Sequence, residues 1–144
     1  MKLRDVMTPN PKTLEPTASI QDAARVMRDE DTGIVPLVEN GRPVGLVTDR
    51  DIVVRAVAEG RAALDRPLRE LATEHLVTAD PDMSTRDAAD LMGERQVRRL
   101  LVCDGERLVG VASIGDLAVK EGKDRRIGDA LENISQGVKE RGDF

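Results

Sequence analysis

Residues 45–51 read Gly-Leu-Val-Thr-Asp-Arg-Asp, and residues 110–116 read Gly-Val-Ala-Ser-Ile-Gly-Asp. Both stretches hold a Gly, a hydrophobic residue, a hydroxyl residue and a closing Asp, and they lie 65 residues apart. The same offset aligns identical residues without a gap, from Thr8 with Thr73 to Val54 with Val119. The chain therefore contains two copies of one supersecondary unit. We place the first repeat at residues 1–64, the second at 65–124 and a tail without counterpart at 125–144.

Each repeat is predicted to fold as strand, helix, strand, strand, helix. A short extended piece carries Thr13 or Thr78, and a helix follows with Ser19 or Ser84 as its N-cap. Each Ser has an Asp three residues later, which indicates a capping box, although Glu suits that position better. Two strands follow in each repeat, at 34–38 and 43–47 in the first and at 100–103 and 108–112 in the second. The turns between them are expected at Asn40-Gly41 and Asp104-Gly105, which supply positive φ angles. A second helix then carries Ile52, Val53, Ala56 and Val57 in the first repeat, and Leu117 and Ala118 in the second.

This element order predicts the α+β class. A unit of about 60 residues buries only about 60% of its unfolded surface, so one repeat is marginal alone. The predicted strands are apolar on both faces. We therefore expect the two repeats to pack sheet to sheet around a pseudo-twofold axis, with helices outside and clefts between the repeats.

Composition excludes several classes of protein. Lys and Arg number 22 against 27 Asp and Glu, a net charge of −5, whereas nucleic-acid binding requires a positive face. One Cys and one His argue against disulfides and against a zinc site. The one aromatic residue is a Phe, so base stacking is not available. No long apolar stretch follows the N-terminus. We therefore expect a cytoplasmic protein without a membrane or nucleic-acid partner.

The tail has a helical pattern of its own. Ile127, Ala130, Leu131 and Ile134 fit one face of a short helix that ends near Gly137. This helix would pack on its own module or across a dimer. The alternative is a docking segment for a partner protein.

The sequence also resembles a known family. The two motifs, together with Met7-Thr8-Pro9 and Val97-Arg98-Arg99-Leu100, are similar to those of a tandem pair of CBS domains, also called a Bateman module. The resemblance covers residues 1 to about 122 and extends to small standalone proteins of the bacterial hypoxic-response type. It implies a regulatory module that binds AMP, ADP, ATP, NAD or S-adenosylmethionine, and a homodimer.

The resemblance also implies which residues bind the ligand. The hydroxyl residue of the motif would contact ribose or phosphate, the Asp would hold the ribose hydroxyls, and the residue after the Gly would line the adenine. Residues at the start of each hairpin would add adenine and phosphate contacts, and the extended segment would border the cleft. The expected ligand-binding residues are Thr13, Thr32, Gly33, Ile34, Leu46, Thr48 and Asp51, and Thr78, Val97, Arg98, Arg99, Val111, Ser113 and Asp116.

Physical chemistry supports a binding role and leaves a simpler alternative open. A carboxylate at a helix start can accept hydrogen bonds from two ribose hydroxyls, and charged bonds are stronger than neutral ones. Asp51 and Asp116 could instead only cap their helices. The repeats also differ, because Arg98 and Arg99 align with Gly33 and Ile34. We expect the site near the Arg pair to prefer a phosphate.

The leading hypothesis is a non-catalytic module that senses adenosine-containing metabolites and regulates an unidentified protein. The alternative is a ligand-independent dimeric interaction protein, a stress-response scaffold. An enzyme has little support, because no nucleophile–base pair, metal spacing or P-loop occurs. The expected dimer faces carry Val53, Val54, Ala56, Val57 and Val119.

Overall fold

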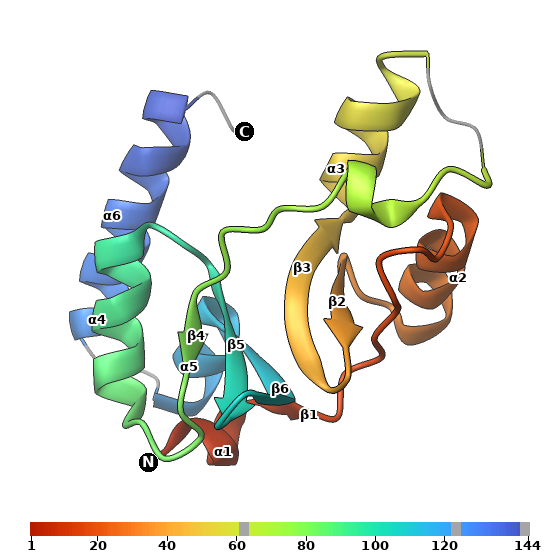
Figure 1. The fold of residues 1–144 in the computed structure, drawn as a ribbon. Helices are drawn as coiled ribbons and strands as arrows, with labels where there is room; N and C mark the ends of the chain where they lie inside the picture. The colour runs from red at the N-terminus through yellow and green to blue at the C-terminus, as the bar shows by residue number, and fades with distance from the viewer. Residues whose placement is uncertain (61–63, 122–124, 142–144) are drawn as a thin grey trace. The chain divides into compact units, whose positions relative to one another are not determined.

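The structure, a computed structural model, describes residues 1–60, 64–121 and 125–141 (Figure 1). The chain forms two compact units. The first-repeat unit holds residues 11–76, and the second-repeat unit combines residues 1–10 with the chain from residue 77 onward. Both contain helices and strands, so the predicted α+β class is confirmed.

The first-repeat unit is built around one β-hairpin. Helix α2 (Ile20–Glu30) leads to strands β2 (Ile34–Glu39) and β3 (Arg42–Thr48), which pair antiparallel. Helix α3 (Asp49–Ile52) follows and continues as a π-helix over Val53–Val57, where a regular second helix was expected. A 3₁₀ turn (Leu68–Glu70) completes the unit.

The second-repeat unit has a four-stranded sheet in the order β1-β6-β5-β4. Strand β4 (Thr78–Ala79) runs parallel to β5 (Arg99–Asp104), which pairs antiparallel with β6 (Arg107–Ser113). The helices are α4 (Thr85–Arg95), α5 (Ile114–Glu121) and α6 (Arg125–Arg141), and the chain's start adds α1 (Leu3–Val6) and β1 (Thr8–Pro9) (Figure 1).

The segments that precede the repeats are exchanged. Strand β1 precedes the first repeat, but Thr8 pairs with Val111 in β6 of the second. At the same offset, Thr73 precedes the second repeat and pairs with Leu46 in β3 of the first. Each compact unit therefore combines the body of one repeat with the segment that leads into the other.

The Gly that opens each motif leaves room for the exchanged segment. A Cβ atom on Gly110 would collide with the Met7 side chain and lie 3.1 Å from the Thr8 carbonyl oxygen. On Gly45 it would lie 3.2 Å from the Ala72 Cβ. Close approach of a neighbouring backbone is one of the requirements that only Gly meets without strain.

The predicted helix starts are confirmed. The Asp22 N–H donates to Ser19 Oγ at 3.1 Å, and the Ser19 N–H donates to Asp22 Oδ2 at 3.0 Å. These bonds hold the pKa of Asp22 below its usual range. In the second repeat the Asp87 N–H donates to Ser84 Oγ at 3.0 Å.

The strands are as predicted to within a few residues, but one turn differs. Asn40 and Gly41 both have positive φ angles, of 53° and 79°, as expected. Asp104 instead remains in β5 and pairs with Arg107, so the second turn is Gly105-Glu106, with φ 63° at Gly105. The expected Asp104-Gly105 turn is therefore wrong by one residue.

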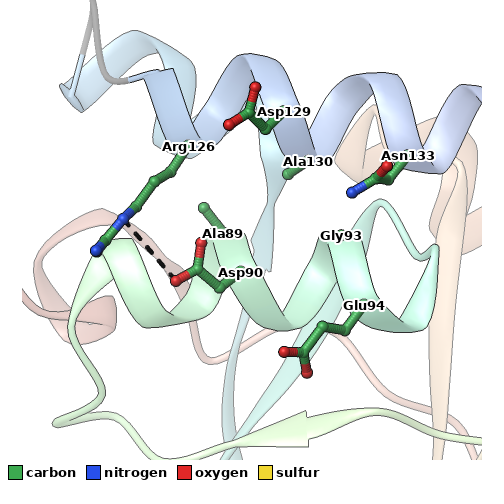
Figure 2. A pocket seen from close by; sticks show the side chains of 8 residues that line it. All are labelled: Ala89, Asp90, Gly93, Glu94, Arg126, Asp129, Ala130 and Asn133. Carbon is green, nitrogen blue, oxygen red and sulfur yellow. Dashed lines mark ion pairs between the residues drawn. The ribbon is translucent and has the colours of Figure 1, made fainter.

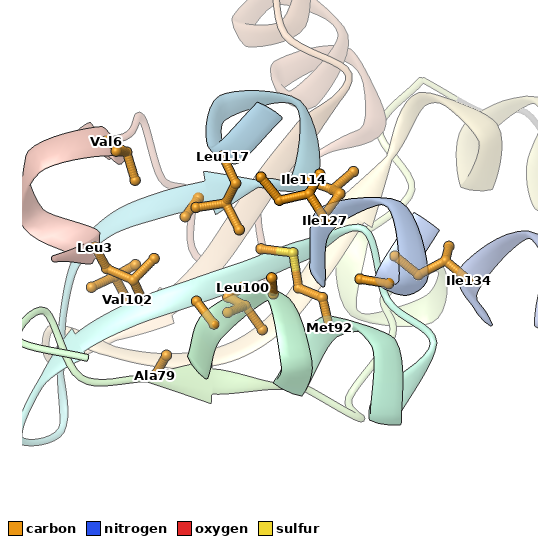
Figure 3. Close-up of a cluster of buried hydrophobic side chains, with 14 residues drawn as sticks. Leu3, Val6, Ala79, Met92, Leu100, Val102, Ile114, Leu117, Ile127 and Ile134 are labelled. Atoms are coloured by element: carbon orange, nitrogen blue, oxygen red, sulfur yellow. The ribbon is translucent and has the colours of Figure 1, made fainter. Parts of the chain in front are cut away.

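The core of the second-repeat unit lies between its sheet and its helices (Figure 3). Leu100 and Val102 are fully buried and lie two residues apart in β5, so their side chains point to the same face of the sheet. On that face they pack in one cluster with Leu3 of α1, Met92 of α4 and Leu117 of α5 (Figure 3). The first-repeat unit has its own cluster, made by Ile20, Ala23, Leu37, Val47, Ala56, Leu68 and Leu71.

Helix α6 packs against α4 of the same chain, which was one of the interpretations of the tail. Ile127, Ala130 and Ile134 are buried in the core of the second-repeat unit. The helix continues to Arg141, so the expected end near Gly137 is wrong. A Gly costs about 1 kcal/mol relative to Ala inside a helix, and packing along α4 overrides that penalty.

Candidate functional site

The first-repeat motif forms a reciprocal helix cap. Thr48 ends β3 and is the N-cap of α3. The Asp51 N–H donates to Thr48 Oγ1 at 3.1 Å, while the Thr48 N–H donates to Asp51 Oδ2 at 2.9 Å. The Asp51 side chain is 14% exposed, and its second oxygen, Oδ1, faces Arg55. The helix-capping role that the sequence left open for Asp51 is therefore present in the structure.

The start of β2 lies beside this cap. Ile34 pairs with Thr48, and the Asp49 N–H donates to the Gly33 carbonyl oxygen at 2.9 Å. A Cβ atom on Gly33 would lie 3.0 Å from Asp49 Oδ2, so the missing side chain makes room for this carboxylate. The Thr32 hydroxyl turns to the Ile34 backbone. The structure therefore gathers five of the residues expected in the first repeat.

The second-repeat motif repeats this geometry. The Asp116 N–H donates to Ser113 Oγ at 3.1 Å, and the Ser113 N–H donates to Asp116 Oδ2 at 2.9 Å. Arg99 pairs with Ser113, and the Ile114 N–H donates to the Arg98 carbonyl oxygen at 2.9 Å. Two different sequences thus build the same strand end and helix start.

The two candidate sites differ in charge. The first holds Asp49 beside Gly33, and Asp51 beside Arg55. The second has Ile114 in place of Asp49, and it adds Arg98 and Arg99, whose side chains are exposed. The second site therefore carries more positive charge relative to its carboxylates than the first, where Arg55 lies beside Asp51.

The other expected residues lie outside the two caps, on strands or in the segments between elements. Leu46 and Val111 are partly exposed and stand two positions before Thr48 and Ser113, on the same strand face. Thr78 is exposed in β4. Thr13 is exposed and precedes Leu14, which bridges to Leu37. Val97 is partly exposed and follows the left-handed residue Gln96 at the end of α4. None of these residues has a side-chain hydrogen bond to the caps.

Sequence reasoning missed two neighbours of the first site. Arg55 Nε lies 3.7 Å from Asp51 Oδ1. The spacing of four residues between an acid and a base on a helix was the available signal. Thr73 forms a two-way backbone pair with Leu46, at 3.0 and 2.9 Å. The sequence held no signal for this pairing, because the identity of Thr8 and Thr73 marks the repeat but not the strand with which either residue pairs.

A shallow hollow of about 240 Å³ lies elsewhere, between α4 and α6 (Figure 2). It is lined by Ala89, Asp90, Gly93, Glu94, Arg126, Asp129, Ala130 and Asn133, none of which is an expected ligand-binding residue. Arg126 Nε lies 3.9 Å from Asp90 Oδ2 across it. Among the described residues, no group of three His, Cys, Asp or Glu side chains is placed to hold a metal ion. None of the described helices has the length and apolar character needed to cross a membrane.

Comparison with known proteins identifies the two repeats. Residues 3–57 and 68–120 each match the CBS domain. The chain belongs to the CBS domain family. A relative, the CBS domain-containing protein YhcV of Bacillus subtilis, is 41% identical over 133 residues, which cover 92% of this chain and 94% of that protein. CBS domains are generally regulatory modules without catalysis of their own.

Solved structures of CBS proteins share this fold. The crystal structure of Hypoxic Response Protein I with two coordinated zinc ions has a TM-score of 0.73 and 32% identity, and the match covers 83% of this chain and 98% of that chain. The CBS domain protein PAE2072 from Pyrobaculum aerophilum, complexed with AMP, has a TM-score of 0.73 and 28% identity over 94% of this chain and 99% of that chain.

Proposed function

We propose that the protein is a non-catalytic regulatory module that binds an adenosine-containing ligand at the motif of each CBS repeat. The observation that supports this most is the repeated geometry of Thr48 with Asp51 and of Ser113 with Asp116. A similar CBS protein has been crystallised with AMP. The candidate ligands are AMP, ADP, ATP, NAD and S-adenosylmethionine, all of which a cytoplasmic protein would encounter.

The cap leaves a carboxylate oxygen for the ligand. Asp51 Oδ2 accepts the Thr48 N–H, so Oδ1 is the atom that would accept a ribose hydroxyl. Each carboxylate oxygen has two acceptor positions, so Oδ2 also keeps one. Leu46 and Val111, on the same strand face as the capping residues, would pack against the adenine. Since Phe is the only aromatic residue of the chain, the adenine would lie on aliphatic side chains.

The charge difference supports different ligands at the two sites. Arg98 or Arg99 would contact a phosphate at the second site, because a guanidinium can bind phosphate through two donors. Asp49, which Ile114 replaces at the second site, would make a phosphate less favourable at the first. We therefore propose nucleotide at the second repeat, and a less charged adenosyl ligand, or none, at the first.

Asp51→Asn and Asp116→Asn are expected to weaken binding without loss of stability. Asn keeps a side-chain oxygen that can still accept the N–H of Thr48 or Ser113, but the charge-assisted bonds to ribose are lost. Affinity at the substituted site should fall by roughly 1.5–3 kcal/mol, about ten- to a hundredfold. The measurement is isothermal titration calorimetry of the full chain with each of the five candidate ligands.

The matched control is Asp22→Asn, which alters the same type of cap on α2, outside either motif. It should leave affinity unchanged. If Asp51→Asn and Asp116→Asn also leave affinity unchanged, the ribose contact is wrong. If the unmodified protein binds none of the five ligands below millimolar concentration, the dimeric scaffold replaces the sensor as the function, and the two Asp residues are helix caps alone.

We further propose a homodimer, because large apolar side chains remain exposed on the second helix of each repeat. Val53 and Val57 are 57% and 56% exposed, and Val119 of α5 is 81% exposed. Ala56, expected on this face, is fully buried instead. Exposed apolar patches on a folded chain commonly mark protein interfaces.

Sedimentation equilibrium at micromolar concentration is expected to show twice the chain mass of 15.7 kDa. Val53→Glu should shift the population to the monomer, because an unpaired charge would be buried at the interface. Leu131→Glu, at an exposed apolar residue of α6, is the control and should leave the dimer intact. A 15.7 kDa species alone for the unmodified protein would contradict the proposal.

A further inference from the structure

Arg55 connects the first candidate site with residues 66–73, here called the linker, which leads into the second repeat. Its Nε lies 3.7 Å from Asp51 Oδ1. From the same guanidinium, Nη1 donates to the Leu71 carbonyl oxygen at 3.3 Å. One side chain thus reaches a candidate ligand-binding carboxylate and the backbone of the linker.

Both contacts are longer than the usual distance. Hydrogen bonds from N–H to oxygen are most often about 2.9–3.0 Å long, and those between charged partners are shorter still. A guanidinium that stands between two acceptors at 3.3 and 3.7 Å satisfies neither fully. If one acceptor is engaged by another group, the guanidinium can move closer to the other.

The linker is tied to the first site by two more contacts. Arg66 Nη1 donates to the Arg55 carbonyl oxygen at 3.5 Å, and Arg66 forms an ion pair with Glu70. Thr73 pairs through its backbone with Leu46, the residue proposed to contact the adenine. The linker therefore contacts Leu46, proposed to pack against the adenine, and Arg55, which lies beside Asp51, proposed to bind the ribose.

The second repeat does not share this arrangement. At the repeat offset Arg55 corresponds to Lys120, which is exposed near the end of α5. The residues that correspond to Arg66, Glu70 and Leu71 belong to α6, which packs on α4. Among the residues that the structure describes, a connection between the motif Asp and a following linker thus occurs in the first repeat alone.

We infer that Arg55 is a positioning residue that couples the Asp51 carboxylate to the linker. A group that takes the acceptor position of Asp51 Oδ1 that faces Arg55 releases the guanidinium, which then binds the Leu71 carbonyl more tightly and further restrains residues 66–73. The inference rests on the proposed function insofar as that group is a ribose hydroxyl. The coupling itself is a property of the ligand-free protein as well.

Amide hydrogen exchange of the full chain, followed by mass spectrometry of the linker peptide, tests the coupling without ligand. Asp51→Asn removes the competing charge and should slow exchange in residues 66–73 by about two- to fivefold. Arg55→Gln removes the donor to Leu71 and should speed exchange there by about three- to tenfold. Lys120→Gln is the matched control and should change linker exchange by less than about twofold.

The double variant is decisive, because a purely structural role of either residue would give independent effects. In the Arg55→Gln background, Asp51→Asn should have no further effect on the linker. An unchanged or faster linker in Asp51→Asn alone, or a slowing that persists in the double variant, would overturn the inference.

Saturating AMP and S-adenosylmethionine are then added to the unmodified protein. Whichever of them binds through Asp51 should slow linker exchange, and Arg55→Gln should abolish that response. Binding that depends on Asp51 without slower exchange would refute the coupling. A lack of binding by both probes would count against the proposed function, while the ligand-free comparison would still decide the coupling.

Discussion

A Leu68→Ala substitution is expected to destabilise the first-repeat unit by about 2–5 kcal/mol, although Leu68 lies beyond the end of the first repeat in the sequence. The side chain is fully buried in the cluster that includes Ile20, Leu37 and Val47. Its N–H also donates to the Ala18 carbonyl oxygen at 2.8 Å. Urea unfolding gives the free-energy change, and amide exchange shows where the structure loosens.

The reciprocal variant is Leu3→Ala. Leu3 is fully buried beside Val102, and its N–H donates to the Met83 carbonyl oxygen at 2.9 Å. The exchange of segments predicts that Leu68→Ala loosens residues 20–57 first and that Leu3→Ala loosens residues 85–121 first. The opposite pattern would mean that each repeat folds with its own leading segment and that the exchange is wrong.

Ile134→Ala is the second substitution with a large expected effect, again about 2–5 kcal/mol. Ile134 is 1% exposed and lies in the core of the second-repeat unit with Met92 (Figure 3). Removal of three methyl or methylene carbons leaves a cavity between α6 and α4. The expected signs are a lower urea midpoint and faster exchange in residues 85–121.

Leu131→Ala on the same helix separates core packing from helix propensity. Leu131 is 45% exposed, and Ala favours a helix at least as well as Leu does. Its effect should stay within about 0.5 kcal/mol. Equal losses of unfolding free energy in Ile134→Ala and Leu131→Ala would show that α6 does not contribute to the core. The tail would then have the alternative role, as a docking segment for a partner protein.

Local patterns in the sequence predicted most of each repeat. Ser19 with Asp22 and Ser84 with Asp87 marked the helix starts, because a hydroxyl followed three residues later by an acid satisfies free N–H groups. Asn40-Gly41 marked a hairpin for a similarly local reason. The motif caps, Thr48 with Asp51 and Ser113 with Asp116, are local in the same sense.

Features that depend on distant partners could not be predicted. Strand β1 has only two residues, too few for a periodic pattern, and its partner Val111 is about a hundred residues away. The end of α6 depends on packing along α4, which overrides the Gly137 signal. The assignment of ligand-binding roles came from the family resemblance and stays a prediction, since the hydrogen bonds of Asp51 and Asp116 also fit simple caps.

The exchange of leading segments also bears on proteolysis. A cut after Gly60 would yield two fragments, and each would carry part of both compact units, since residues 1–10 belong with the second repeat and residues 65–76 with the first. Neither fragment could complete a core by itself. The nicked halves would stay together as a complemented pair, so the protein could tolerate a break in its covalent chain at this point.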